Sequence, residues 1–142
     1  MADLQQQTGD AAEGRKAAEA FLTADLTCPF GPSFFLGDLG RFVRDRCPDP
    51  KENLPLVEIR LADGETLDVC HIIGVAPQWV MLAVRDPGSQ HDGMAVELVP
   101  YPMIRHVRVG TRRASGSTIG FSQVRPPEVL SPETLVGAAR RP

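Results

Sequence analysis

Residues that could perform covalent or metal chemistry are scattered through this chain of 142 residues. Ser89, His91 and Asp92 have the side-chain types of a hydrolase triad, but they are crowded into the single loop GSQHDG. A working triad needs members that a rigid scaffold holds beside an oxyanion hole. Cys70 and His71 are neighbours in a predicted strand, so they should point to opposite faces and not converge on one ion. We therefore expect no enzymatic activity, no metal and no cofactor.

Arginines near the C-terminal end are the strongest candidates for binding chemistry. Residues 1–100 contain 16 acidic and 8 basic residues, whereas residues 101–142 contain 2 acidic residues and 7 arginines. Such a basic segment can bind the phosphates of a nucleic acid, or it can dock on the acidic surface of a neighbouring subunit. The candidate phosphate contacts lie within nine positions: Arg105, Arg108, Arg112 and Arg113.

Two aromatic residues could add stacking contacts to a nucleic acid. Stacking on an aromatic side chain is worth about 1 to 3 kcal/mol per base. Trp79 begins a strongly apolar stretch, so it could instead belong to the core. Tyr101 lies between Pro100 and Pro102 at a predicted corner, where it could either stack a base or anchor a contact between subunits.

The elements that would position these residues begin with one or two helices. Asp10 and Glu13 resemble a capping box, which predicts a first helix that begins there. Ser33 can cap a second helix, which is followed by the proline-bounded linker CPDPKENLP at residues 47–55. Its apolar positions follow the helical period and should cover an apolar surface: Phe35, Leu36, Leu39, Phe42 and Val43.

Strands should follow the linker, because the apolar period changes to two. The segment 56–61 alternates and ends at Asp63-Gly64, a hairpin turn signal. Residues 79–84 are apolar at every position, which is typical of a strand buried on both sides. The other predicted strands span 66–75, 94–98 and 103–109. Five short strands favour a small closed barrel, and the 13 prolines argue against a helical bundle.

No sustained period continues after residue 109. The glycine, serine and proline there predict a tail extended over a surface, with a possible short helix that Ser131 would cap. The sequence thus divides into an N-terminal helical arm with linker (1–55), a five-stranded barrel (56–109) and a basic tail (110–142).

The barrel segment resembles the Sm-like family, and within it the bacterial Hfq branch. The residues that carry the resemblance are VEIRLADGETLDVCHIIG, QWVMLAVRD and VPYPMIRHVRV. The resemblance implies a mainly β fold, namely a small Sm-like (SH3-like) barrel preceded by one or two α-helices and followed by an irregular tail. It also implies a homo-oligomeric ring of six or seven copies, in which the fourth strand of one barrel pairs with the fifth strand of the next.

Two functions are compatible with this resemblance. The first is a non-enzymatic ring that binds single-stranded RNA or another nucleic acid through Trp79, Tyr101 and the four arginines. Pro100, Tyr101 and Pro102 replace the family's usual second motif, so we expect the arginines to dominate such binding. The second is a structural subunit that contacts itself and other assembly proteins, for example in a phage-like particle or a bacterial complex.

The sequence predicts a cytoplasmic protein without a membrane span. The longest stretch without Asp, Glu, Lys or Arg is Val69–Val84, 16 residues, which is below the roughly 18 apolar residues that cross a bilayer. The first residues lack the apolar stretch of a secretory signal. The odd number of cysteines, three without close spacing, fits a reducing compartment.

Overall fold

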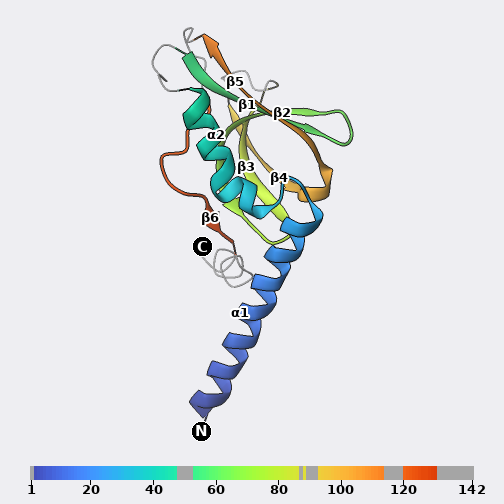
Figure 1. The fold of residues 1–142 in the computed structure, drawn as a ribbon, viewed down its shortest axis with the longest axis vertical. Helices are drawn as coiled ribbons and strands as arrows, with labels where there is room; N and C mark the ends of the chain where they lie inside the picture. The colour runs from blue at the N-terminus through green and yellow to red at the C-terminus, as the bar shows by residue number, and fades with distance from the viewer. Residues whose placement is uncertain (1, 48–52, 87, 89–92, 114–119, 131–142) are drawn as a thin grey trace.

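A computed structural model describes residues 2–47, 53–86, 88, 93–113 and 120–130 (Figure 1). The chain forms helices first and strands afterwards, as the sequence predicted. In chain order the elements are α1 (Ala2–Thr27), the π-helical turn η1 (Phe34–Asp38), α2 (Leu39–Arg46), β1 (Asn53–Leu61), β2 (Thr66–Val75), β3 (Trp79–Arg85), β4 (Met94–Pro100), the 3₁₀ turn η2 (Tyr101–Met103), β5 (Ile104–Arg113) and β6 (Glu128–Val129).

Helix α1 begins at Ala2, eight residues before the predicted cap. The residues before Asp10 include several good helix formers, and extending an existing helix is easier than nucleating one, so Asp10 lies inside the helix.

Ser33 also differs from the prediction, because its side chain makes no capping hydrogen bond. Its backbone N–H and its hydroxyl both donate to the carboxylate of Asp25, which ties the start of η1 to the end of α1.

The second helical stretch covers one side of the sheet with a narrower apolar face than the sequence predicted. Phe35, Leu39 and Val43 are four residues apart and are buried in the core. Leu36 and Phe42 lie to either side of this line and are exposed. The predicted apolar stripe is therefore correct for three of its five positions.

The sheet has the strand order β4-β3-β2-β1-β5, and each pair along this path is antiparallel. Gly64, with φ of 90°, turns β1 into β2, and the carboxylate of Asp63 accepts the Glu65 N–H, so the predicted hairpin is confirmed. The five predicted strands are all present, although β1 starts at Asn53 and β5 continues to Arg113, beyond the predicted limits 56 and 109. Strands β4 and β5 are the two ends of the path.

The described part of the segment after β5 is irregular, lies across the sheet and contributes two side chains to the buried interior. We name residues 120–130 the strap. Phe121 and Leu130 are buried, and the Phe121 ring belongs to the core. The strap crosses from β1 to β2, since the Phe121 N–H donates to Pro55 O and the Leu130 N–H donates to Val75 O. Within it, β6 adds a short parallel pairing to β2. The predicted helix after Ser131 lies outside the described residues.

None of the helices among the described residues is both long and apolar enough to cross a membrane.

Candidate functional site

The two aromatic candidates lie at the same end of the sheet but are not equally accessible. Tyr101 is only 2% exposed, and its hydroxyl donates a 2.6 Å hydrogen bond to Ala76 O. Burial, followed by the nearby Asp25 carboxylate, raises the pKa of Tyr101. Its ring therefore offers no face to a base or to a neighbouring subunit. Trp79 is half-buried at the start of β3, where it pairs with Pro100.

Arg112 is committed to a contact inside the chain. One terminal nitrogen of its guanidinium lies 2.9 Å from a carboxylate oxygen of Asp68 on β2, which is separated from β5 by β1. The Arg112 side chain is 23% exposed, and its Nε is buried without a hydrogen-bond partner among the described residues. This ion pair distinguishes Arg112 from the exposed arginines of β5.

The remaining arginines of β5 are exposed, and the register of β1 and β5 places Arg60, which the sequence analysis missed, beside His106 of this strand. Val107 and Val109 of β5 pack against the core, so His106 and Arg108 point outward. In the register of β1 and β5, Arg60 lies opposite His106, and Glu58 lies opposite Arg108. We name the outward surface of Arg60, His106 and Arg108 the basic face. Arg105 and Arg113 are exposed on the same strand.

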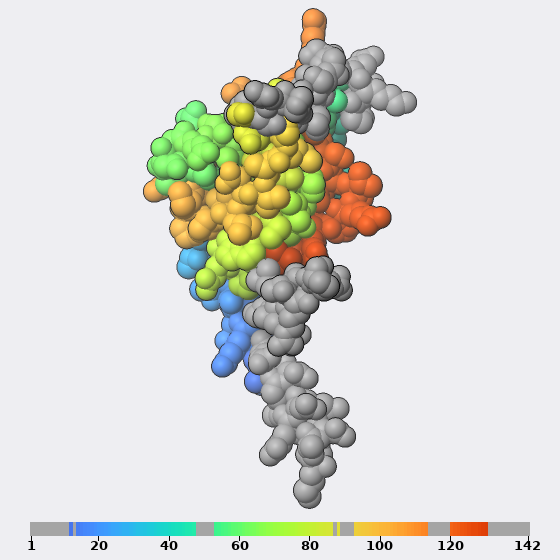
Figure 2. All heavy atoms as spheres, turned by 180° about the vertical axis from the view of Figure 1, so that it is seen from behind, coloured from blue at the N-terminus to red at the C-terminus, as the bar shows by residue number. Residues whose placement is uncertain are grey.

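Strand β4 presents an apolar row on the opposite end of the sheet. Its side chains alternate, so that Ala95 and Val99 pack against the core. The outward side chains Met94, Val96 and Leu98 are 55%, 60% and 54% exposed. We name these three residues the β4 row. Figure 2 shows β4, the yellow-orange segment, lying open on the surface beside β3.

The outward surface of β3 continues the β4 row. Across the strand pair, Met81 lies opposite Leu98, and Ala83 lies opposite Val96. The sequence predicted that β3 is buried on both sides. Its inward side chains are buried, whereas of its outward side chains Ala83 is buried, Met81 is half-buried and Arg85 is exposed.

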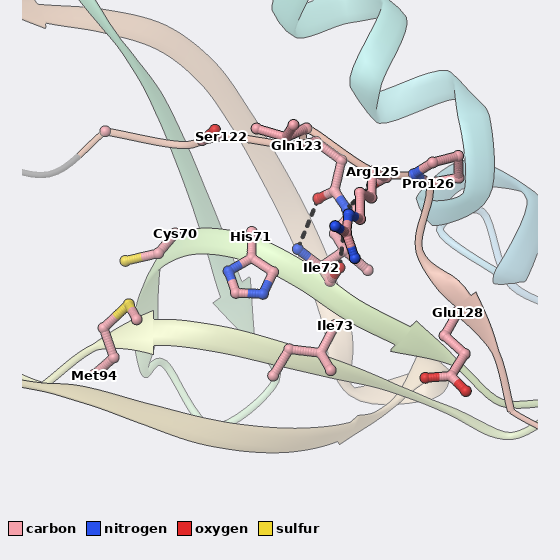
Figure 3. Close-up of a pocket in the computed structure, with 12 residues that line it drawn as sticks. Cys70, His71, Ile72, Ile73, Met94, Ser122, Gln123, Arg125, Pro126 and Glu128 are labelled. Atoms are coloured by element: carbon pink, nitrogen blue, oxygen red, sulfur yellow. Dashed lines mark hydrogen bonds between the residues drawn. The ribbon is translucent and has the colours of Figure 1, made fainter. Parts of the chain in front are cut away.

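A groove of about 580 Å³ is lined by residues of β2 and of the strap, together with Met94 of β4 (Figure 3). The Gln123 side chain closes one wall, because its amide accepts the Ile72 N–H at 2.9 Å and donates to Ile72 O at 3.0 Å. His71 and Ile73 of β2 also line the groove, as do Arg125 and Glu128 of the strap. The shape depends on Gln123, which lies 51 residues from its partner, and no local sequence signal indicated this contact.

The groove does not assemble a reactive centre from the candidate residues. Cys70 is buried, and burial, assisted by the Asp68 carboxylate, raises the pKa of its thiol, so it lacks the thiolate character of a nucleophile. Across the described ranges, no three His, Cys, Asp or Glu side chains come together in a way that could hold a metal ion. Ser89, His91 and Asp92 lie outside the described residues.

Comparisons with protein-family models, with curated proteins and with solved structures find no match for this chain.

Proposed function

We propose that this protein is a non-enzymatic subunit that assembles with copies of itself into a closed ring. Its five principal strands would form a small Sm-like barrel, and β4 of one copy would pair with β5 of the next. The strand order supports this proposal, because β4 and β5 are the two ends of the path. Within the described ranges, each end strand has one row of N–H and C=O groups that no other strand pairs with, and a head-to-tail ring would satisfy both rows.

The exposed β4 row is the observation that carries the proposal. Soluble proteins normally protect an edge strand with charges, prolines or a covering segment, because an apolar edge invites another strand. Here Met94, Val96 and Leu98 are each more than half exposed beside an open edge. Complete burial of such side chains is worth about 1.5 to 3 kcal/mol each, so covering the exposed half of three would contribute a few kcal/mol.

Charges on the two edges are complementary. Glu97 is a half-buried residue of β4, on the opposite side of the strand from the β4 row, while Arg105 and Arg108 are exposed on β5. Opposite charges on paired strands stabilise the pairing and help to select the partner edge. A contact from β4 to β5 would place these groups near one another, whereas pairing two β4 edges would bring the Glu97 carboxylates of both copies into the same interface.

Replacing Val96 by Lys tests the proposal. A lysine in the middle of an edge strand opposes strand addition, so Val96→Lys should shift the protein from an oligomer to a monomer in sedimentation velocity. Val124→Lys is the matched control, because Val124 is 92% exposed on the strap. The proposal fails if the wild type is already monomeric at micromolar concentration, or if Val96→Lys assembles as the control does.

Nucleic-acid binding is a second candidate function, and the basic face favours it. Arg60, His106 and Arg108 lie on one surface, and paired residues on adjacent strands have Cβ atoms about 5 Å apart. Such spacing suits successive phosphate contacts of a single strand, which require no base-specific contact. In a ring this surface would recur in every copy. Titration of labelled single-stranded RNA at two salt concentrations is the test, and absence of binding at low salt would remove this function.

A further inference from the structure

Helix α1 is a second element with exposed apolar side chains among the described residues, namely Leu22 and Leu26 near its C-terminal end. Near its C-terminal end, Phe21 and Ala24 pack against the core. Figure 1 shows the rest of the helix extending away from the sheet. Its 26 residues correspond to about 39 Å. Helices in proteins are stabilised mainly by packing, and Gly14 costs about 1 kcal/mol relative to Ala in a helix interior. Packing against a partner would therefore stabilise the projecting part of the helix.

The exposed side of α1 identifies what that partner must provide. Leu22 and Leu26 are 58% and 78% exposed, and residues four apart in a helix lie on one face. Arg15 and Glu19 are exposed and lie on the same side, closer to the N-terminus. The partner surface must therefore offer an apolar strip with charged groups beyond one end of it.

We propose that α1 of one copy docks on the outward surface of β4 in a second copy. This inference rests on the proposed self-assembly and adds the segment that covers the β4 row. Leu22 and Leu26 are separated by about 6 Å along the helix axis, and Val96 and Leu98 by about 6.8 Å along the strand, so the two apolar pairs match in spacing. Strand pairing occupies the edge of β4, and the helix occupies its face, so both contacts can form together.

Charge complementarity fixes the direction of the docked helix. When Leu26 lies on Leu98 and Leu22 lies on Val96, the preceding turn of the helix reaches the Met94 end of the row. Arg85 lies opposite Met94, and Asp86 follows it. Glu19 then approaches the charge of Arg85, and Arg15 approaches that of Asp86, so both pairs are of opposite charge. Arg85 and Asp86 each also keep a contact within their own chain. The reverse direction would place Glu19 and Arg15 beyond Leu98, near Pro100 and Trp79, where no charged partner faces them on β3 or β4.

Photo-cross-linking between isotopically distinct copies tests this contact directly. The full chain with p-benzoylphenylalanine in place of Leu26 is mixed with ¹⁵N-labelled wild type, irradiated, digested with trypsin and mapped by mass spectrometry. Cleavage after Arg85 and Arg105 isolates β4 in the peptide of residues 86–105. We expect cross-links from the unlabelled helix to the labelled 86–105 peptide. Cross-links to the labelled 17–41 peptide would show helix-to-helix pairing and overturn the proposal.

The variant Leu26→Glu separates this inference from the proposed function. We expect it to raise the dissociation constant of the oligomer by at least about tenfold, since it removes a buried leucine from each contact. Val124→Glu, on the exposed strap, is the control. An oligomer that tolerates Leu26→Glu but is dissociated by Val96→Lys would refute the docked helix and retain strand pairing. A wild-type monomer would refute both.

Discussion

At the scale of single residues, Tyr101 has a structural role. Its residue type suggested a stacking or subunit contact at the surface, but the side chain is buried. It is the only tyrosine in the chain, and its hydroxyl bonds to Ala76 O at the turn between β2 and β3. We predict that Tyr101→Phe lowers the free energy of unfolding by about 1 to 2 kcal/mol, because Ala76 O loses its buried donor. Urea denaturation of both proteins checks this. Trp79→Phe, at a half-buried position that keeps its aromatic character, should cost less.

The raised pKa of Tyr101 also predicts a specific loss of stability in alkali. The unfolded tyrosine ionises near pH 10, whereas the buried one retains its proton to higher pH. Above pH 10 the unfolded state therefore releases a proton that the native state keeps, and stability falls as pH rises, at up to about 1.4 kcal/mol per pH unit. Tyr101→Phe should lack this component. Equal pH slopes for the two proteins between pH 9 and 11 would contradict the burial of this hydroxyl.

Arginines of similar appearance in the sequence should behave differently on substitution. Arg112→Ala removes the partner of Asp68 and should lower stability by about 1 kcal/mol, with little effect on nucleic acid. Arg60→Ala and Arg108→Ala should leave stability nearly unchanged. If single strands bind the basic face, each should flatten the slope of log affinity against log salt by about 0.7. Thermal melts and salt titrations of the three variants provide the comparison, and an Arg112→Ala variant with the largest loss of salt dependence would show that the site is misplaced.

At the scale of elements, the strap shows why a strand-like segment with no apolar period can still be essential. The Gln123 side-chain amide forms hydrogen bonds with both the N–H and the C=O of Ile72, as the backbone of a neighbouring strand would. We predict that Gln123→Ala lowers stability by about 1 to 3 kcal/mol, because the buried Ile72 loses both partners. Hydrogen exchange should report faster exchange at the Ile72 amide. Gln78→Ala, at an exposed turn position, is the control, and equal effects of the two substitutions would argue against this role.

The strands could be predicted from the sequence, whereas the site depended on contacts between distant segments. Period-two alternation and the Asp63-Gly64 turn are local signals, and they located five strands and one hairpin correctly. Arg60 could not be recognised as a member of the basic face, because its neighbour His106 is set by the register of β1 and β5. The same limit applies to Arg112 and Asp68, which are 44 residues apart. Local patterns predict which face a side chain occupies, but not which strand lies beside it.

At the scale of the whole molecule, the two ends of the sheet have different characters. One end, at β4, is apolar and exposed; the other, at β5, carries exposed arginines. In the part of the chain that the structure describes, the β4 row and the side chains of Leu22 and Leu26 on α1 are all more than half exposed. The proposed head-to-tail assembly would cover these surfaces with others of the same chain, and this is the main reason for proposing that the molecule is one subunit of a larger particle.

The molar mass of the wild-type chain tests this account most directly. It should be measured by light scattering on a sizing column at micromolar concentration, after nuclease treatment so that bound nucleic acid does not contribute. The account predicts one closed species whose mass is an integral multiple of the 15.4 kDa chain and does not grow with concentration. A single species of 15.4 kDa would contradict the central claim, because each proposed contact requires a second copy.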